Sequence, residues 1–123
     1  MKITVKNIGL ILIMILLGSQ SSHADSSQQY QNMWKEYEAL INKGSTRDAL
    51  QTAQKIYDKA LKENQVDQKF KAIIHIYQNR MVIEENSETN IINDLKSSIQ
   101  KSSSVDEQTL LKILLAQSYF SYY

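Results

Sequence analysis

Helical periodicity is the feature that most constrains the fold of this chain. After residue 24, apolar residues recur every three or four positions in five segments, and the chain contains no Pro. Such spacing places the apolar side chains of a segment on one face of a helix, and no Pro interrupts it. No stretch alternates apolar and polar residues over five or more positions, so strands are not expected. The sequence predicts an all-α fold of about five antiparallel amphipathic helices.

Short polar breaks set the helix boundaries. Gly44 suits the left-handed position that follows a helix, and Ser45 or Thr46 can cap the next one. The second break contains neither Gly nor Pro, so it is the least sharply defined. Ser104 and Glu107 match a capping box, with Ser at the N-cap and Glu three residues later. We expect helices over about residues 30–41, 46–63, 66–85, 87–101 and 105–123.

The helices are expected to pack as antiparallel hairpins, because short breaks join them. The alanines of the second helix are small enough to let a neighbouring helix approach closely. Packing should centre on residues of the apolar stripes, namely Trp34, Tyr37, Leu50, Ala53, Tyr57, Ile73, Ile74, Tyr77, Leu111, Leu114 and Leu115.

The first 24 residues have the three-part layout of a secretory signal peptide. Lys2 and Lys6 give a positive start, residues 8–17 are almost wholly apolar, and residues 22–24 offer small residues for cleavage. The apolar run is about half of the roughly 20 residues needed to span a bilayer. We therefore predict no stable membrane span after cleavage. The predicted organisation is a signal peptide at 1–24, a polar leader at 25–29 and a helical-hairpin domain at 30–123.

The composition excludes several functional classes. Without residues 1–24, two of the 14 basic residues are lost and none of the 13 acidic ones, which leaves 12 basic against 13 acidic. A nucleic-acid binder or a polybasic membrane-surface module would need an excess of basic residues. The chain has no Cys, so disulfides, thiolate catalysis, Cys-bound zinc and iron–sulfur clusters are excluded. The domain then depends on apolar burial alone, which leaves it marginally stable.

Few residues offer catalytic or metal-binding chemistry. His75 has no Asp, Glu or Cys three or four positions away, and we interpret it as a structural helix residue. Glu84, Glu85 and Glu88 could bind Ca²⁺ or share a proton, but a solvated helix end explains them more simply. Gly44 is the only Gly after the leader, which excludes Gly-rich phosphate loops. We predict that the protein is not an enzyme and that it holds no cofactor and no metal.

Aromatic residues mark two candidate surfaces. Tyr30, Trp34 and Tyr37 recur at helical spacing, which is more typical of a core than of a sugar- or peptide-binding face. The last helix is apolar around most of its circumference, and such helices are normally buried on several sides. It also lacks the polar cap that a solenoid needs, so either the domain is incomplete at this end or the helix folds back on the first two hairpins. We predict a possible interaction surface at Tyr119, Phe120, Tyr122 and Tyr123.

A weak internal repeat supports the hairpin interpretation. Ala49 and Leu50 recur 42 residues later as Ile91 and Ile92, and other helix-face residues recur after 41 or 43. Two helices per unit at this spacing are typical of an α-solenoid, although any series of similar helices gives such matches. Gly44, Ala49 and Leu50 resemble the turn and second-helix start of a tetratricopeptide repeat. The Trp of the preceding helix sits one place late and the closing Pro is absent, so we infer hairpin geometry of this kind rather than a true repeat.

Several segments resemble the extreme N-terminus of the large alpha-2-macroglobulin-like proteins that Bacteroidetes bacteria secrete. These segments are residues 30–41, 49–50, 55–57, 70–75, 114–116 and 119–123. In that family, a signal peptide and a similar helical segment precede a long array of β-sandwich domains, and the proteins trap or inhibit proteases. The resemblance implies that this chain is only the leading helical module. The Cys–Gln thioester of some members cannot form here, because the chain has no Cys.

Two functions are therefore expected. The first is a non-enzymatic exported interaction module, the N-terminal part of an alpha-2-macroglobulin-like protease inhibitor, with protein as its partner. That partner would be the downstream domains of a longer chain or another exported protein. The alternative is a free-standing small periplasmic binding or adaptor protein with tetratricopeptide-like helices. Either protein would be periplasmic, outer-membrane-associated or secreted in a Gram-negative bacterium.

Overall fold

The computed structural model describes residues 25–84 and 88–122. Among these residues, 89% lie in five helices and none lies in a strand, so the predicted all-α fold is confirmed. The chain divides into two compact units, Met1–Met33 and Trp34–Tyr123. The predicted signal peptide, residues 1–24, lies outside the described residues. No helix in the described part of the chain has the length and apolar content needed to cross a bilayer.

The described part of the first unit, residues 25–33, is entirely helical. The sequence predicts a polar leader at 25–29, before the first helix. It is helical although most of its side chains are exposed. The Gln28 amide donates a hydrogen bond to the Asn32 side-chain oxygen at 3.0 Å, one helical turn later. Such pairs support a helix without any apolar burial.

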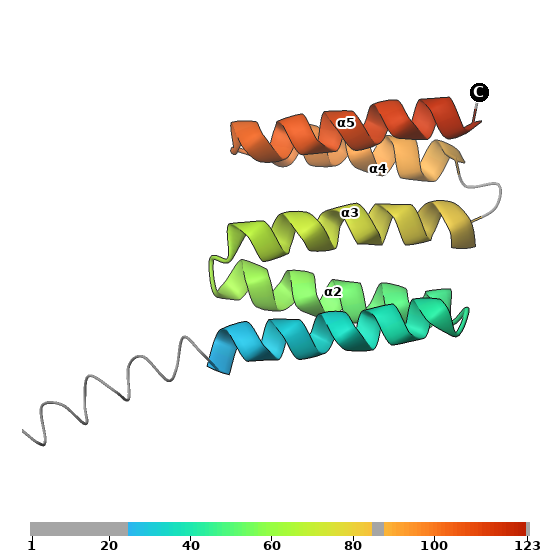
Figure 1. Cartoon of the computed structure of the whole chain (residues 1–123). Coiled ribbons are helices and arrows are strands. Elements are labelled where there is room, and N and C mark those ends of the chain that lie inside the picture. Colours follow the sequence, from blue (N-terminus) through green and yellow to red (C-terminus); the bar gives the residue numbers. More distant parts are fainter. Residues whose placement is uncertain (1–24, 85–87, 123) are drawn as a thin grey trace, which may run out of the picture. The chain divides into compact units, whose positions relative to one another are not determined.

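The second unit contains residues 34–42 and four further helices, whose axes lie nearly parallel (Figure 1). Each predicted break falls within a few residues of an observed one. The third helix ends two residues earlier than predicted, because Glu84 is already its C-cap. The bounds are α2 Thr46–Lys62, α3 Val66–Ile83, α4 Glu88–Lys101 and α5 Val105–Tyr122.

Two helix ends use the same left-handed turn. Gly44 has φ of +76°, and the Ser45 N–H donates to the Leu40 carbonyl at 2.9 Å. This is the Schellman arrangement expected of a Gly after a helix. Asn64, with φ of +54°, makes the equivalent turn after α2. The sequence left this boundary open, yet Asn is the residue that most readily takes the place of Gly in that conformation.

The two predicted N-caps differ in outcome. Ser45 occupies the N-cap of α2, but its side chain makes no capping hydrogen bond. Its ψ of 61° departs from the extended backbone that capping side chains need. Ser104 does cap α5, because its hydroxyl accepts the Glu107 N–H at 3.3 Å. Only half of the capping box forms, since the Glu107 carboxylate pairs with Lys69 of α3.

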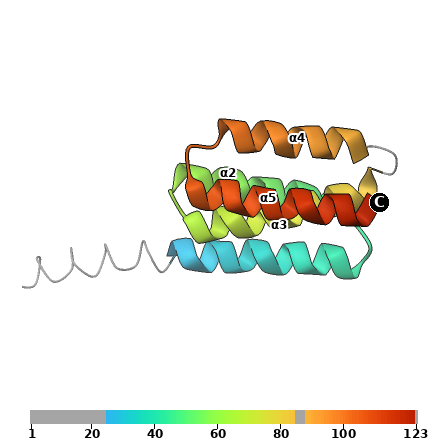
Figure 2. The ribbon, with the colours of Figure 1, turned by 90° about the horizontal axis from the view of Figure 1, so that it is seen from above.

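The core of the second unit has two parts. Between α2 and α3, Ala49, Ala53 and Ala72 are wholly buried. These small side chains let the two helices approach closely, as predicted from the alanines of the second helix. The α4–α5 hairpin packs against another side of α3. It lies above α3 in Figure 1, and α5 overlaps α3 when the molecule is seen from above in Figure 2. This second cluster consists of Ile73, Tyr77, Ile91, Leu95, Leu111 and Leu114.

Most of the predicted core is buried, but not all of it. Trp34, Tyr37, Ala53, Ile73, Tyr77, Leu111 and Leu114 are buried as expected. Leu50, Tyr57, Ile74 and Leu115 are only partly buried. Leu50 and Tyr57 line a groove between the hairpins, which leaves one side of each accessible. The prediction omitted α4, although Ile91 and Leu95 are completely inaccessible.

Helix α5 is buried on one side by the described residues, although its apolar residues cover most of its circumference. Its inner face buries Leu111, Leu114 and Ser118, whereas Ile113 and Phe120 face outward at 52% and 89% exposure. Helix α5 packs antiparallel on α4 and touches α3, and no described residue covers its outer face. An apolar sequence all round the helix therefore does not mean that neighbours surround it.

Candidate functional site

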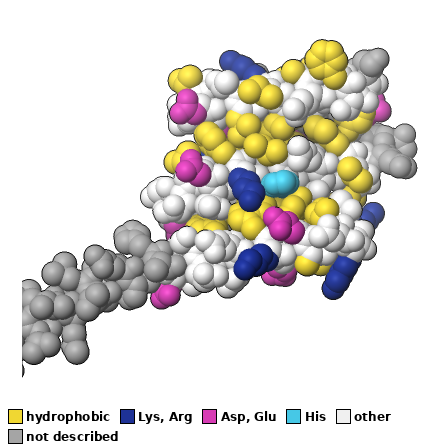
Figure 3. All heavy atoms as spheres, in the orientation of Figure 1, with side chains coloured by type: hydrophobic (Ala, Val, Ile, Leu, Met, Phe, Trp, Pro, Cys, Tyr) yellow, Lys and Arg dark blue, Asp and Glu magenta, His cyan; other side chains and the backbone are white. Residues whose placement is uncertain are grey.

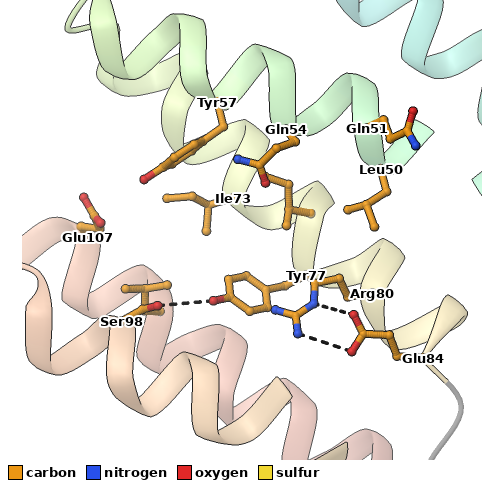
Figure 4. Close-up of a pocket in the computed structure, with 12 residues that line it drawn as sticks. Leu50, Gln51, Gln54, Tyr57, Ile73, Tyr77, Arg80, Glu84, Ser98 and Glu107 are labelled. Carbon is orange, nitrogen blue, oxygen red and sulfur yellow. Dashed lines mark hydrogen bonds and ion pairs between the residues drawn. The ribbon is translucent and has the colours of Figure 1, made fainter. Parts of the chain in front are cut away.

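A groove lies between the α2–α3 pair and the α4–α5 hairpin (Figure 4). Its volume of about 520 Å³ falls within the range of small-ligand pockets. The walls are mainly aliphatic and aromatic, with polar side chains along the rim. The lining residues are Leu50, Gln51, Gln54, Tyr57, Ile73, Ile76, Tyr77, Arg80, Glu84, Ser98, Glu107 and Leu111.

The charged groups on the groove rim are already paired within the protein. Arg80 donates from Nε to Glu84 and from a terminal nitrogen to Asp94, each at 2.8 Å. The hydrogen bond with Glu84 is the largest of the effects that raise the pKa of Arg80. Glu107 accepts a hydrogen bond from Lys69. The groove therefore presents compensated charges rather than a free cation or anion.

Its remaining polar groups are neutral and loosely engaged. The hydroxyls of Tyr77 and Ser98 are 3.5 Å apart, at the limit of a hydrogen bond. Within the described residues, neither the Gln51 amide nor the Tyr57 hydroxyl makes a hydrogen bond, and Figure 4 shows both on the α2 side. Amide and hydroxyl groups above apolar walls suit an uncharged ligand.

His75 lies at the interface between residues 34–42 and α3. Its Nδ1 is 3.2 Å from the Tyr37 hydroxyl, and its ring packs at tilted angles against Trp34 and Tyr37, with centroids 5.2 and 4.9 Å away. Burial is the main cause that lowers the pKa of His75, and the nearby Lys71 ammonium lowers it further. The structural role predicted for His75 agrees with this packing.

Polar contacts also hold the aromatic residues of this interface. The Trp34 indole N–H donates to Gln68 at 2.8 Å, and the Asn79 amide donates to the Tyr37 hydroxyl at 3.1 Å. Lys71 places its ammonium 4.2 Å from the centroid of the Trp34 ring. Trp34 and Tyr37 are about 95% buried, so they belong to the core and form no open binding face.

The predicted interaction surface is partly accessible. Phe120 is 89% exposed and Tyr119 40% exposed, with the Lys96 ammonium 5.9 Å from the Tyr119 ring centroid. Tyr122 is half-buried, and its hydroxyl has no hydrogen-bond partner among the described residues. Burial, followed by the charges of Glu88 and Glu84, raises the pKa of Tyr122. Tyr123 lies outside the described residues. Figure 3 shows hydrophobic side chains gathered over α5 and along its junction with α3.

The acidic residues near the α3–α4 connection, Glu84, Glu85 and Glu88, are described only in part. Glu84 is ion-paired with Arg80, Glu88 begins α4, and Glu85 lies outside the described residues. No group of three or more potential metal ligands occurs in residues 25–84 and 88–122.

No protein-family model, curated protein or solved structure matches this chain. Its function is therefore inferred from the groove, the interface around His75 and the outer face of α5.

Proposed function

We propose that this chain is a non-enzymatic exported helical module that binds protein, and that it is the N-terminal part of an alpha-2-macroglobulin-like protease inhibitor. One observation carries the binding role, namely the outer face of α5. Phe120 is 89% exposed there, and the ten residues from Ile113 to Tyr122 include no charged side chain. Apolar helix faces of this kind mark protein interaction sites.

The energetics favour a covered α5. Full burial of a Phe side chain contributes about 1.5–3 kcal/mol relative to exposure, and almost none of this is realised at Phe120. Ile113, at 52% exposure, adds to the same face. A partner that covers both residues would gain more than either isolated surface contact provides. An apolar protein surface supplies that cover, because the face lacks the basic charge that nucleic acid would need.

The family assignment is supported by the helix-face segments that resemble alpha-2-macroglobulin-like proteins. In such a protein the partner of α5 is the first domain that follows the helices. Sequencing of the transcript across the codon for Tyr123 tests this assignment. A continuing reading frame for β-sandwich domains supports it, and an immediate stop codon with no such sequence downstream overturns it.

If the reading frame continues, the longer protein allows a direct test of the binding face. Phe120→Ser should lower the midpoint of thermal unfolding of the helical module by several degrees, because the downstream domain loses its apolar contact. Val82→Ser is the matched control, since Val82 is 67% exposed on α3, away from this face. Equal shifts in both variants would argue against α5 as the binding surface.

The groove supports a second candidate function, a free-standing periplasmic adaptor that binds an uncharged peptide segment. The supporting observation is the pair of unengaged polar groups, the Gln51 amide and the Tyr57 hydroxyl, above apolar walls. Nuclear magnetic resonance titration with uncharged tetrapeptides tests it. Shifts confined to residues near Tyr57 and Ile76, and abolished by Gln54→Trp, would support this function. Shifts that are absent or spread over the whole surface would reject it.

A further inference from the structure

The groove between the α2–α3 pair and the α4–α5 hairpin is long and narrow. Its lining residues run from Leu50 to Tyr57 along α2 and from Ile73 to Glu84 along α3. At the rise of an α-helix these stretches span about 10 and 16 Å. The groove volume of about 520 Å³, spread over that length, leaves a mean cross-section of roughly 30–50 Å². A helix, about 10 Å across, is too thick to enter such a groove, whereas a single extended chain fits.

The middle of the groove is lined by aliphatic side chains. Ile73 and Ile76 come from α3, Leu50 from α2 and Leu111 from α5. An extended peptide carries an N–H and a C=O group on almost every residue, and each group that is buried against these side chains without a partner opposes binding. An alkyl chain has no such groups, so apolar walls satisfy it along its whole length. The walls therefore favour an alkyl chain over a peptide backbone.

Polar groups gather toward one end of the groove, where Figure 4 shows Gln51, Arg80 and Glu84. Arg80 is bonded to two carboxylates, those of Glu84 and Asp94, each at 2.8 Å. This group of side chains has one more carboxylate than guanidinium, so it repels an anionic head group. The Gln51 amide makes no hydrogen bond within the described residues. A hydroxyl can donate to a carboxylate and accept from an amide, so an uncharged, hydroxyl-bearing head fits this end.

We propose that the groove binds the single alkyl chain of a neutral lipid, with the hydroxyl-bearing head beside Gln51 and the chain directed toward Tyr57. The Tyr57 ring packs against the apolar cluster of the core, so it offers the tail an aromatic wall. At the far end Glu107 is ion-paired with Lys69, so the tail meets no uncompensated charge there. The groove has room for about eight to twelve carbons in an extended chain, at about 1.3 Å each.

Nuclear magnetic resonance titration of the full 123-residue chain with decyl glucoside, kept below its micelle concentration, tests the proposal. Methyl resonances of Ile73, Ile76 and Leu111 should shift and should saturate with a single bound ligand. The affinity should rise about three- to fourfold with each methylene added from hexyl to decyl. It should level off beyond dodecyl, because further carbons no longer fit in the groove. An affinity that keeps rising would indicate partition onto an open apolar surface and would overturn the proposal.

Two variants locate the binding site. Ile76→Gln places an amide in the groove and should weaken the binding of decyl glucoside by about tenfold or more. Ile113→Gln is the matched control, because Ile113 is 52% exposed on α5 and does not line the groove. Gln54→Trp changes an exposed residue on the groove rim and should also block binding, so the test does not depend on Ile76→Gln remaining folded. A larger loss with Ile113→Gln would place the ligand on α5 and would overturn the groove as its site.

Ligands with the same chain length test the head group and the class of ligand. Decanoate should bind about tenfold more weakly than decyl glucoside, because its carboxylate approaches Glu84 and Asp94. Tighter binding of decanoate or of decyltrimethylammonium would overturn the uncharged head. Shifts of the groove methyl groups with uncharged tetrapeptides, and none with decyl glucoside, would overturn the lipid and leave the peptide-binding function in place. The proposed role of α5 is independent of these results, because it depends on the sequence that follows Tyr123.

Discussion

Helices α3 and α5 each contain 18 residues and each carry apolar side chains on more than one face, yet their surroundings differ. Residues 34–42 contact one side of α3, and the α4–α5 hairpin covers another. Helix α5 is covered on its inner face alone. The difference shows that the local pattern specifies a helix and its apolar residues, whereas the number of neighbouring helices decides which of those residues are buried.

The side of α3 that residues 34–42 cover and the outer face of α5 also differ in polarity. The side of α3 that residues 34–42 cover contains Asn79, which is 6% exposed and is hydrogen-bonded to Tyr37. The outer face of α5 instead carries Phe120, which is 89% exposed. A satisfied buried polar pair fixes one register between two helices. The α5 face has no such restriction, so it can accept a partner by apolar contact alone.

The largest expected difference between the two faces comes from their aromatic residues. Trp34→Ala should lower the free energy of unfolding by about 3–5 kcal/mol, because it empties a buried site and leaves Gln68 without its indole partner. Phe120→Ala should change it by less than about 0.5 kcal/mol, since the ring is exposed. Urea unfolding of both variants, at a concentration that keeps the chain monomeric, measures this. Similar losses would mean that the outer face of α5 is packed in solution.

The Tyr37–Asn79 pair gives the next largest difference. Tyr37→Phe should cost about 1–3 kcal/mol, because the buried Asn79 amide loses the hydroxyl that it both donates to and accepts from. Tyr119→Phe on α5 removes a hydroxyl from a partly exposed ring and should cost close to nothing. Thermal unfolding of the two variants makes the comparison. A neutral Tyr37→Phe would show that water replaces the lost partner.

The ion pair between Lys69 and Glu107 links α3 directly to α5. Its side chains are only 19% and 18% exposed, so a double-mutant cycle with Lys69→Met and Glu107→Gln should give a coupling of about 1 kcal/mol. The exposed pair Lys59–Glu63, within α2, should give about 0.3–0.5 kcal/mol. The Lys69–Glu107 coupling should also be less sensitive to added salt. Equal couplings would indicate that α5 moves away from α3 in solution.

Much of the helical architecture could be predicted from local signals. Apolar spacing located the helices, Gly44 marked one turn, and Ser104 marked the start of α5. Asn64 carried a usable signal as well, because Asn tolerates the left-handed conformation. The cap at Ser45 failed because the preceding turn sets its backbone angles, which a search for capping residues does not consider.

The candidate sites were less predictable, because they depend on residues far apart in the chain. His75 meets Tyr37 from 38 positions away, and the groove combines residues of α2, α3, α4 and α5. No local spacing reports such contacts. The C-terminal aromatic cluster was identified from sequence, but which of its side chains face outward is decided by the rotation of α5 on α4. Ile113 was missed as part of that surface for the same reason.

The smallest expected effect is a pH dependence of stability that arises at His75, on the side of α3 that residues 34–42 cover. Burial and Lys71 lower the pKa of His75 below its ordinary value of 6.5, while Glu38 opposes them. The unfolded chain therefore binds a proton more readily than the folded one. Stability should fall as pH decreases below about 6.5 and should level off below the folded-state pKa.

The difference in unfolding free energy between the wild type and His75→Gln isolates this effect, because the carboxylates titrate in both proteins. From pH 8 to pH 5, the wild type should lose more stability than the variant. Amide resonances of residues 34–42 should shift over the same range, whereas those of residues 113–120 should not. Parallel stability curves would show that the charged imidazole is accommodated between Trp34 and Tyr37. The interface between residues 34–42 and α3 would then accept a positive charge as readily as water does. In that case it would differ from the outer face of α5 only in how closely its side chains are packed.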